Sequence, residues 1–323
     1  MAVSFHSSNY PAHKLGFRNK NGSYCATKRI PALAIPPSSI ESSNLLDSQS
    51  GLNTASTDSG SGGYLLNQEN AIGIIGGVSP NSTLNFLKQL VNWSTKDSEN
   101  CPPFILCSNP ALRKELLLYE RNSFSSNVRK NGSLQINHAP IVENLRQKRL
   151  FLENSGARCI VMPCHISHSW YDEVSSGCSV CFLHVGECLA RELKEAKLKP
   201  IEAGSTLQIG LLATDVTLTA GVYHQKLKNQ GFEVVLPDKA TMEHTVIPAV
   251  EALNRKDMEG AQNLLRIALQ VLLVRAVNTI ILASDDMWEL LPRNDPLLRK
   301  CVNPMDALVR STIKWAQSAQ QAI

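Results

Sequence analysis

Short apolar runs that alternate with helical patterns are the feature that most restricts how this chain can fold. Residues 71–93 (AIGIIGGVSPNSTLNFLKQLVNW) begin with an apolar run and a Gly-Gly-x-Ser-Pro turn, and then carry apolar positions at helical spacing, at Leu84, Leu87 and Val91. Residues 207–237 repeat this order, with a Thr-rich turn between an apolar run and a helical pattern. Because strands that alternate with helices build parallel sheets, the sequence predicts an α/β fold.

A second pair of segments indicates that the chain contains two similar halves. Residues 153–168 (ENSGARCIVMPCHISH) and 272–288 (LLVRAVNTIILASDDMW) each run from a helix end through an apolar strand to a small or reactive side chain. We therefore predict two similar parallel-sheet α/β units related by a pseudo-twofold axis. The first unit comprises residues 71–184 and 302–323, and the second unit comprises residues 185–301.

Reactive side chains follow the strands at the edge where ligands of such sheets bind. In open α/β sheets, ligands lie outside the carboxyl ends of the strands. Cys164 and Ser284 follow corresponding strands of the two halves. We therefore expect them to face one cleft from its two sides, each beside a helix start whose dipole favours an anion.

The first 65 residues differ in composition from the rest of the chain. No Asp or Glu occurs from Met1 to Ile40, while this stretch is rich in Ser, Asn and Pro and carries five basic residues. Acid-poor, basic and Ser-rich leaders are typical of organelle transit peptides. Residues 45–63 then have the composition of a flexible linker. We predict that residues 1–65 are a transit peptide and linker that directs import into a plastid, with the mitochondrion as second choice and a merely disordered tail as the alternative.

Composition argues against two classes of partner. The formal charge of +4 over 323 residues is not concentrated in a basic stripe, so we expect no nucleic acid partner. The longest apolar run is interrupted by Arg266 and Gln270 and is shorter than the roughly 18 to 20 residues of a membrane-spanning helix, so we expect no membrane insertion. The nine cysteines are expected to be thiols rather than a disulfide framework.

Six short segments, taken in order and with their spacing, resemble a known family. They read IGIIGGVSPNST, CSNP, MPCHISH, IGLLATDVTLTAGVY, TIILASDD and NPMD. Together they resemble the aspartate/glutamate racemase family of cofactor-independent enzymes, over residues 71–323. The resemblance implies the two-unit fold, with the C-terminal helix returning to the first unit, and it implies that no cofactor is used. Homodimers are usual in that family, although no segment here indicates an interface by itself.

The resemblance implies a mechanism with two cysteines on opposite faces of the substrate's α-carbon. One thiolate removes the α-proton and the other thiol delivers a proton from the far side, which inverts the centre. Cys164 occupies the first of these positions, but Ser284 occupies the second. A hydroxyl is far less acidic than a thiol and needs an activating base. The neighbouring Asp285 or Asp286 is therefore a candidate for the second acid/base.

The resemblance also implies where the substrate binds, and here the sequence departs from the family. The family's side-chain clamp is an arginine after the Asn-Pro pair and a lysine in the second half. These positions fall at Glu115 and Glu243, unless a shifted register restores Arg113. Two glutamates would repel an acidic side chain, so we expect a substrate other than aspartate or glutamate. The groups expected to bind its α-carboxylate are Gly77, Ser79, Thr83, Asn109, His165, Thr214 and Thr217.

Histidines near Cys164 offer a further catalytic group. His165 stands where the family usually has asparagine, and His168 lies one helical turn beyond Cys164. We place His168 among the catalytic candidates, because a thiolate–imidazolium pair would suit the proposed chemistry. The alternative is a His168 that bonds only a backbone carbonyl or solvent.

Other patterns are interpreted as structural. The spacing of Cys178, Cys181, His184 and Cys188 resembles a zinc site, but the segment SVCFLHV is expected to be a strand, in which Cys181 and His184 point to opposite faces. We therefore predict no metal. The glycines at 76 and 77 do not form a dinucleotide fingerprint, so NAD is not expected. Asp306 is expected to cap or anchor the last helix.

Three functional hypotheses remain open at this point. The first is a cofactor-independent amino-acid racemase or related isomerase that acts at the α-carbon of a small carboxylate through Cys164 and, opposite, Ser284 with Asp285. The second is a one-base cysteine enzyme, a decarboxylase or isomerase of a small acid. The third is a catalytically silent protein that retains an anion-binding cleft.

Overall fold

The computed structural model describes residues 68–321, except for positions 78–79, 96–99, 110, 113, 117, 120–137 and 200–205. The predicted transit peptide and linker, Ser79 and Arg113 lie outside the described residues. Import into a plastid and a homodimer therefore remain predictions. Within the described part of the chain, no helix combines the length and the apolar character needed to cross a bilayer.

The first unit contains a four-stranded parallel sheet with strand order β2-β1-β3-β4. Its strands are β1 (Ile72–Ile75), β2 (Phe104–Cys107), β3 (Cys159–Val161) and β4 (Cys181–Phe182). Its helices are α1 (Pro80–Ser94), α3 (Ala139–Asn154), the 3-10 helix η2 (Ile166–Trp170) and α4 (Tyr171–Ser175). Parallel neighbours require helical crossovers, and α1 and α3 supply them in this unit.

The second unit contains a four-stranded parallel sheet with the equivalent order, β6-β5-β7-β8. Its strands are β5 (Gln208–Ala213), β6 (Glu233–Val235), β7 (Thr279–Ala283) and β8 (Cys301–Val302). Its helices are α6 (Asp215–Thr219), α7 (His224–Lys228), α8 (Lys239–Thr241), the π-helix η3 (Met242–Val246), α9 (Ile247–Asn254), α10 (Met258–Val274), α11 (Asp285–Leu290) and the 3-10 helix η4 (Leu298–Lys300). The prediction of two similar parallel-sheet α/β units is confirmed.

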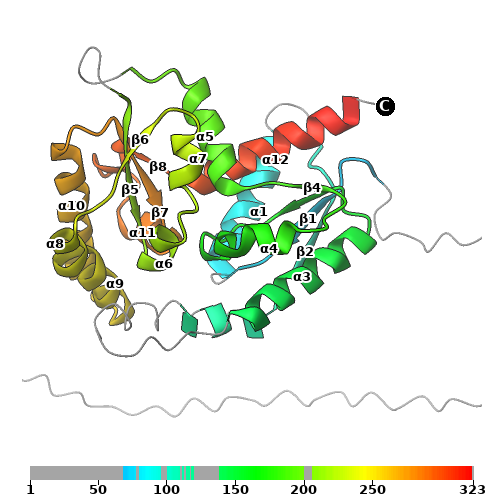
Figure 1. Ribbon diagram of the computed structural model, residues 1–323, viewed down its shortest axis with the longest axis horizontal. Coiled ribbons are helices and arrows are strands. Elements are labelled where there is room, and N and C mark those ends of the chain that lie inside the picture. Colours follow the sequence, from blue (N-terminus) through cyan, green and yellow to red (C-terminus); the bar gives the residue numbers. More distant parts are fainter. Residues whose placement is uncertain are drawn as a thin grey trace, which may run out of the picture. The chain divides into compact units, whose positions relative to one another are not determined.

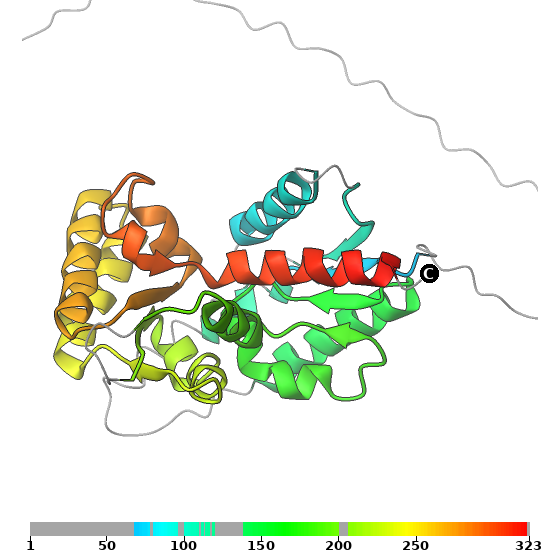
Figure 2. The same ribbon diagram turned by 90° about the horizontal axis from the view of Figure 1, so that it is seen from above.

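Two helices connect the units. They are α5 (Val185–Glu195) and the C-terminal α12 (Pro304–Gln321). Figure 2 shows α12 running between α1 and α5, and it packs against both of these helices. β8 of the second sheet ends at Val302, and α5 packs on α12. The boundaries of the two units, which we place after residues 184 and 301, therefore remain predictions.

Side chains that alternate along each strand pack into separate apolar clusters on the two faces of the sheet. Ile72 and Ile74 of β1 pack in one apolar cluster with α1 and α12, whereas Ile75 packs on the other side with α3, as the period of two along a strand requires. In the second unit, Ile209 of β5 belongs to the same cluster as Ile72, while Leu212 packs against α10. Figure 1 shows α8, α9 and α10 together on the outer side of that sheet. The inner faces of the two sheets therefore share one core.

The buried face of α1 differs from the prediction. Leu84 and Val91 are 59% and 39% exposed, and only Leu87 packs against the core. The face turned inward carries Phe86 and Leu90, together with the polar residues Ser82, Thr83 and Ser94. A buried hydroxyl is acceptable when it has a hydrogen-bond partner, and the Ser94 hydroxyl donates to the Leu90 carbonyl at 2.7 Å. Apolar spacing alone therefore predicted the helix but the wrong inward face.

Candidate active site

A small pocket lies between the carboxyl ends of the two sheets. Its walls come from both units, and it encloses a cavity of about 50 Å³. Residues that line it are Ser82, Pro163, Cys164, His165 and Ile166 from the first unit, and Thr214, Thr217, Ala283, Ser284, Asp285 and Asp286 from the second unit. The strands end here, as expected for ligand sites of parallel sheets.

Cys164 lies on the first-unit wall, three residues after the end of β3 at Val161 and directly after Met162–Pro163. Its side chain is 5% exposed, and its backbone N–H donates to the Met162 carbonyl at 2.8 Å. The thiol packs directly over Gly77. A β-carbon at Gly77 would stand 2.1 Å from the Cys164 Cβ and 2.5 Å from its sulfur. Gly77 therefore contributes space for the cysteine, because any larger residue would displace it.

Ser284 and Asp285 lie on the second-unit wall at the end of β7. Ser284 is the N-cap of α11, and its hydroxyl accepts a hydrogen bond from the Met287 N–H at 3.4 Å. This capping role is the usual one for serine before a helix, and it engages a lone pair of the hydroxyl oxygen. Asp285 begins the helix, and its side chain is 21% exposed. The structure thus places Cys164, Ser284 and Asp285 around one cavity.

His165 connects the two walls. Its Nδ1 lies 2.5 Å from the Tyr223 hydroxyl oxygen, and its Nε2 lies 3.8 Å from the Asp285 Oδ1. Burial alone raises the pKa of Asp285, but the charge of His165 and the hydroxyl of Ser82 outweigh burial and hold that pKa below its ordinary value. Burial, followed by Asp285 and Cys164, raises the pKa of the Tyr223 phenol well above its usual range. A paired, ionised carboxylate thus faces the pocket.

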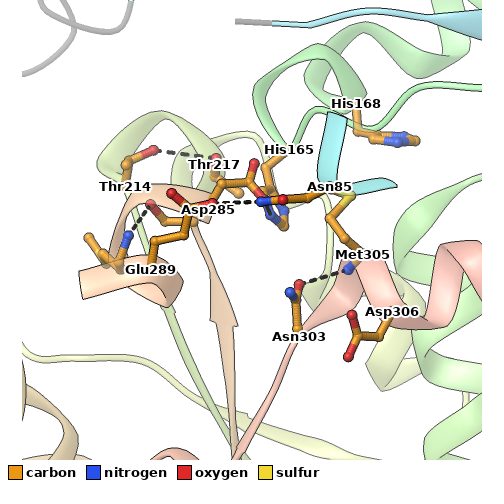
Figure 3. Close-up of polar contacts among 12 residues, drawn as sticks. Asn85, His165, His168, Thr214, Thr217, Asp285, Glu289, Asn303, Met305 and Asp306 are labelled. Carbon is orange, nitrogen blue, oxygen red and sulfur yellow. Dashed lines mark hydrogen bonds and ion pairs between the residues drawn. The ribbon is translucent and has the colours of Figure 1, made fainter. Parts of the chain in front are cut away.

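His168 lies apart from this group. Figure 3 draws His165 and Asp285 near the centre and His168 away from them. The His168 ring is buried, and its Nε2–H donates to the Met162 carbonyl at 3.0 Å. Burial, with a smaller contribution from His184, holds the pKa of His168 well below its usual value. Since the ring is neutral and bonds a backbone carbonyl, the geometry favours the structural alternative over a thiolate–imidazolium pair.

The predicted carboxylate-binding groups divide into two sets. The hydroxyl oxygens of Thr214 and Thr217 line the pocket, 3.4 Å apart (Figure 3). Thr83 is buried on α1 but does not line the pocket. Asn109 also lies outside the pocket, and its side-chain oxygen accepts from the Ala111 N–H at 2.9 Å. The structure therefore gathers the threonines of the second unit with Cys164, whereas Asn109 lies after the end of β2 at a separate hollow.

That separate hollow contains a buried lysine. The hollow is about 640 Å³ and is lined by Asn109, Cys107 and Lys148, among others. Lys148 is 5% exposed, and its Nζ has no hydrogen-bond partner among the described residues. Burial lowers the pKa of Lys148, against the opposing influence of Cys107, Cys164 and Glu115. Glu115 therefore lies near a cation. A lysine in this place had no recognisable signal in the sequence.

Glu243 lies on the surface of the second unit. It belongs to η3, its side chain is 52% exposed, and it forms an ion pair with Lys239 at 3.6 Å. An exposed pair of this kind contributes little to stability. The carboxylate at this position pairs with a neighbour on its own surface and does not line the pocket.

The cysteine-rich segment is organised differently from the expectation. Only Cys181 and Phe182 are in strand conformation, so the expected longer strand is wrong. The chain leaves the sheet at Leu183, and His184 becomes the N-cap of α5, where its Nδ1 accepts from the N–H groups of Gly186 and Glu187. Among the described residues, no three His, Cys, Asp or Glu side chains gather as metal ligands would.

The start of α12 is anchored to α1. Asp306 accepts a hydrogen bond from the Gln89 side chain of α1 at 2.9 Å, which agrees with its expected anchoring role. The cap itself is Asn303, whose side-chain oxygen accepts from the Met305 N–H at 3.0 Å (Figure 3). Asn303, Ser82 and Tyr223 were not predicted as functional residues. All three lie in the quoted family segments, which were their only signal in the sequence.

Comparison with known proteins gives sequence and structural relatives. The broad specificity amino-acid racemase RacX of Bacillus subtilis is 25% identical over 167 residues, which are 52% of this chain and 64% of that protein. An aspartate racemase homologue from Pyrococcus horikoshii OT3 superimposes with a TM-score of 0.59 and 21% identity, covering 77% of this chain and 99% of that chain. The aspartate racemase of Picrophilus torridus superimposes with a TM-score of 0.55 and 21% identity, covering 76% of this chain and 94% of that chain.

These comparisons agree with the architecture. The aligned part of this chain spans less than two thirds of the Bacillus relative, and the two solved structures share the fold of two parallel-sheet units. The model of the Asp/Glu/hydantoin racemase family matches residues 75–312, which include both walls of the pocket and all strands of the two sheets except Ile72–Ile74 of β1. The chain therefore belongs to the Asp/Glu/hydantoin racemase family.

Proposed function

We propose that this protein moves a proton at the α-carbon of a small carboxylate, as an amino-acid racemase or related isomerase that uses no cofactor. The observation that carries the proposal is that Cys164 of one unit and Ser284 and Asp285 of the other line the same pocket. Inversion requires proton-transfer groups on two sides of a carbon atom, and a pocket between two units supplies two such walls.

Cys164 is the proposed base. A thiolate can act as a base near neutral pH, and donors such as the N–H groups at helix starts favour its charged form. The hydroxyls of Thr214 and Thr217 are proposed to donate to the substrate carboxylate, whose charge increases in the enolate-like transition state. Serine at position 284 supplies no thiol, so the opposite wall depends on Ser284 with Asp285.

The proposed substrate is a small amino acid that lacks an acidic side chain. The cavity of about 50 Å³ is far below the roughly 300 Å³ of typical ligand pockets, so only a small molecule fits unless the walls move apart. Glu115 and Glu243 stand where the family resemblance calls for cationic groups. The similarity to a broad specificity racemase supports the same choice.

Hydrogen exchange at the α-carbon tests the proposal. The full chain would be incubated in D2O with both enantiomers of each amino acid in a panel, and deuterium at Cα would be measured by NMR. We expect exchange with at least one small neutral amino acid, and a loss of at least about 100-fold for at least one of its enantiomers in Cys164→Ala, in line with the contribution of a positioned base.

The matched control is Cys101→Ala, which removes a thiol outside the pocket and should leave the exchange rate unchanged. Exchange that survives in full in Cys164→Ala, or no exchange with any substrate, contradicts the proposal. In the latter case, thermal stabilisation by a small carboxylate would favour an anion-binding homologue without turnover.

A one-base enzyme is the second candidate, because the Ser284 hydroxyl is engaged as a helix cap. Such an enzyme would use Cys164 alone to decarboxylate or isomerise a small acid. Its product would have a single handedness, whereas racemic product supports the first proposal.

A further inference from the structure

Three side chains form a chain that crosses the pocket from one unit to the other and back. The Tyr223 hydroxyl and His165 Nδ1 are 2.5 Å apart, and His165 Nε2 and Asp285 Oδ1 are 3.8 Å apart. Tyr223 is completely buried, and His165 is nearly so. Both His165 and Asp285 line the cavity with Cys164.

The tyrosine determines which nitrogen of His165 carries a proton. Burial keeps the Tyr223 phenol protonated, because its pKa is raised well above the usual range. While the ring is neutral, a phenol O–H that donates to Nδ1 leaves the ring proton on Nε2; when the ring takes up a second proton, Nδ1–H donates to the phenol oxygen instead. Nε2 is buried and has no partner within hydrogen-bond distance among the described residues, and the nearest acceptor in this direction is the Asp285 carboxylate.

Ser284 is less suited to proton transfer than its neighbour. Its hydroxyl accepts from the Met287 N–H as the cap of α11, and a hydroxyl gives up its proton only to a strong base. Asp285 instead carries a carboxylate that needs no activation to accept a proton. Its ionised form is stabilised by His165 and by the hydroxyl of Ser82.

We propose that Asp285 replaces the second thiol as the acid/base on the wall that faces Cys164, and that His165 and Tyr223 are positioning residues that orient its carboxylate and share its proton. This inference rests on the proposed function. The groups that face the pair and share its electrostatic environment are Ser82, Cys164, His168, Tyr223 and Asp286.

Protons are conserved in both directions of the proposed inversion. In one direction the Cys164 thiolate takes the α-proton, and the electron pair of the C–H bond passes into the enolate-like intermediate. The proton that the His165–Asp285 pair holds as imidazolium and carboxylate then passes through an Asp285 oxygen to the other face of Cα. Neutral imidazole and carboxylate remain. In the reverse direction the Asp285 carboxylate takes the α-proton, and the Cys164 thiol delivers one.

Exchange measured separately for the two enantiomers tests the inference. In D2O, each enantiomer loses its α-proton to the wall that it faces. We expect Asp285→Asn to lower exchange of one enantiomer by at least about 100-fold and to change exchange of the other by less than about 10-fold. Cys164→Ala should show the opposite selectivity. The matched control is Glu289→Gln, which removes an exposed carboxylate from the same helix and should change neither rate.

Variants of His165 and Tyr223 test the positioning role through the pH dependence of exchange on each face, which a purely structural role would not change selectively. His165→Gln removes the group that holds the pKa of Asp285 low, so burial should dominate and that pKa should rise. Because only the ionised form accepts a proton, the acid limb of exchange on the Asp285 face should move to higher pH. The limb on the Cys164 face should stay in place. Tyr223→Phe, which keeps the ring volume, should lower exchange on the Asp285 face by about 10-fold.

The possible outcomes separate the two proposals. No exchange by the wild-type chain overturns both of them. Wild-type exchange that persists with both enantiomers in Asp285→Asn overturns the inference alone, as does face-selective loss in Ser284→Ala in place of Asp285→Asn. An equal loss on both faces in His165→Gln, with no movement of the acid limb, overturns the roles of His165 and Tyr223.

Discussion

At the scale of single residues, the position of the candidate base depends on a glycine that contributes only space. The Cys164 side chain occupies the volume that a β-carbon at Gly77 would need. The two residues are far apart in the sequence and belong to two strand–turn connections of the same sheet. Their contact means that the thiol is held by backbone geometry as well as by its own rotamer.

We expect Gly77→Ala to lower the free energy of unfolding by about 1–3 kcal/mol, the usual cost of overpacking, and to displace Cys164. Denaturant unfolding measures the stability. In a Cys164→Gly background, the same substitution should cost less than about 1 kcal/mol, because the atoms that collide are gone. An equal cost in both backgrounds would show that the strain lies elsewhere.

At the scale of secondary-structure elements, helix α5 begins with a cap that works only in one protonation state. The His184 Nδ1 accepts hydrogen bonds from the N–H groups of Gly186 at 3.0 Å and Glu187 at 3.4 Å. A protonated imidazole has no acceptor. Burial, together with the charge of Lys226, lowers the pKa of His184 to about 4. The start of this helix is therefore sensitive to acid.

The stability that neutral His184 contributes should be complete above the unfolded-state pKa of about 6.5 and should be lost as the pH falls to about 4. The loss is on the order of 3 kcal/mol, at about 1.4 kcal/mol for each pH unit between 6.5 and about 4. The measurement is the free energy of unfolding at pH 7, 5.5 and 4. His184→Asn keeps a good cap that does not titrate, so its stability should depend less steeply on pH. An identical pH dependence in the two proteins would contradict this role.

At the scale of the whole described region, the last helix joins the two units. Arg310 of α12 forms two hydrogen bonds to the Glu192 carboxylate of α5, at 2.8 and 2.5 Å, and Asp306 bonds α1 on the other side. The apolar cluster of α12 includes residues of β1, β5 and β7. Because the units share this core, they are expected to unfold together.

Leu308→Ala removes a fully buried side chain from this shared core, so it should lower the free energy of unfolding by about 2–5 kcal/mol. Probes in both units should report one transition. Lys314→Ala on the exposed side of the same helix, which breaks only a surface ion pair with Glu195, should change stability by at most about 1 kcal/mol. Two separate transitions, with only one of them shifted by Leu308→Ala, would show that the units are independent.

Much of the site's location followed from local patterns. Apolar runs and turns predicted the two parallel sheets, and the rule that ligands bind at the carboxyl ends of strands brought Cys164 and Ser284 to one pocket. The same patterns failed for the inward face of α1, because the hydroxyls of Ser82 and Ser94 are buried there while Leu84 is exposed. Hydrogen bonding can make a polar face an inner face, and spacing does not reveal this.

By itself, the sequence determined the α/β architecture, the repeat and the order of reactive side chains along the chain, because strand and helix periodicity are local properties. Only the tertiary structure decided which of those side chains meet. Tyr223 reaches His165, His165 approaches Asp285, and His168 turns to a backbone carbonyl. The physical reason is that burial and hydrogen-bond partners come from residues distant in the sequence, and they decide both protonation and orientation.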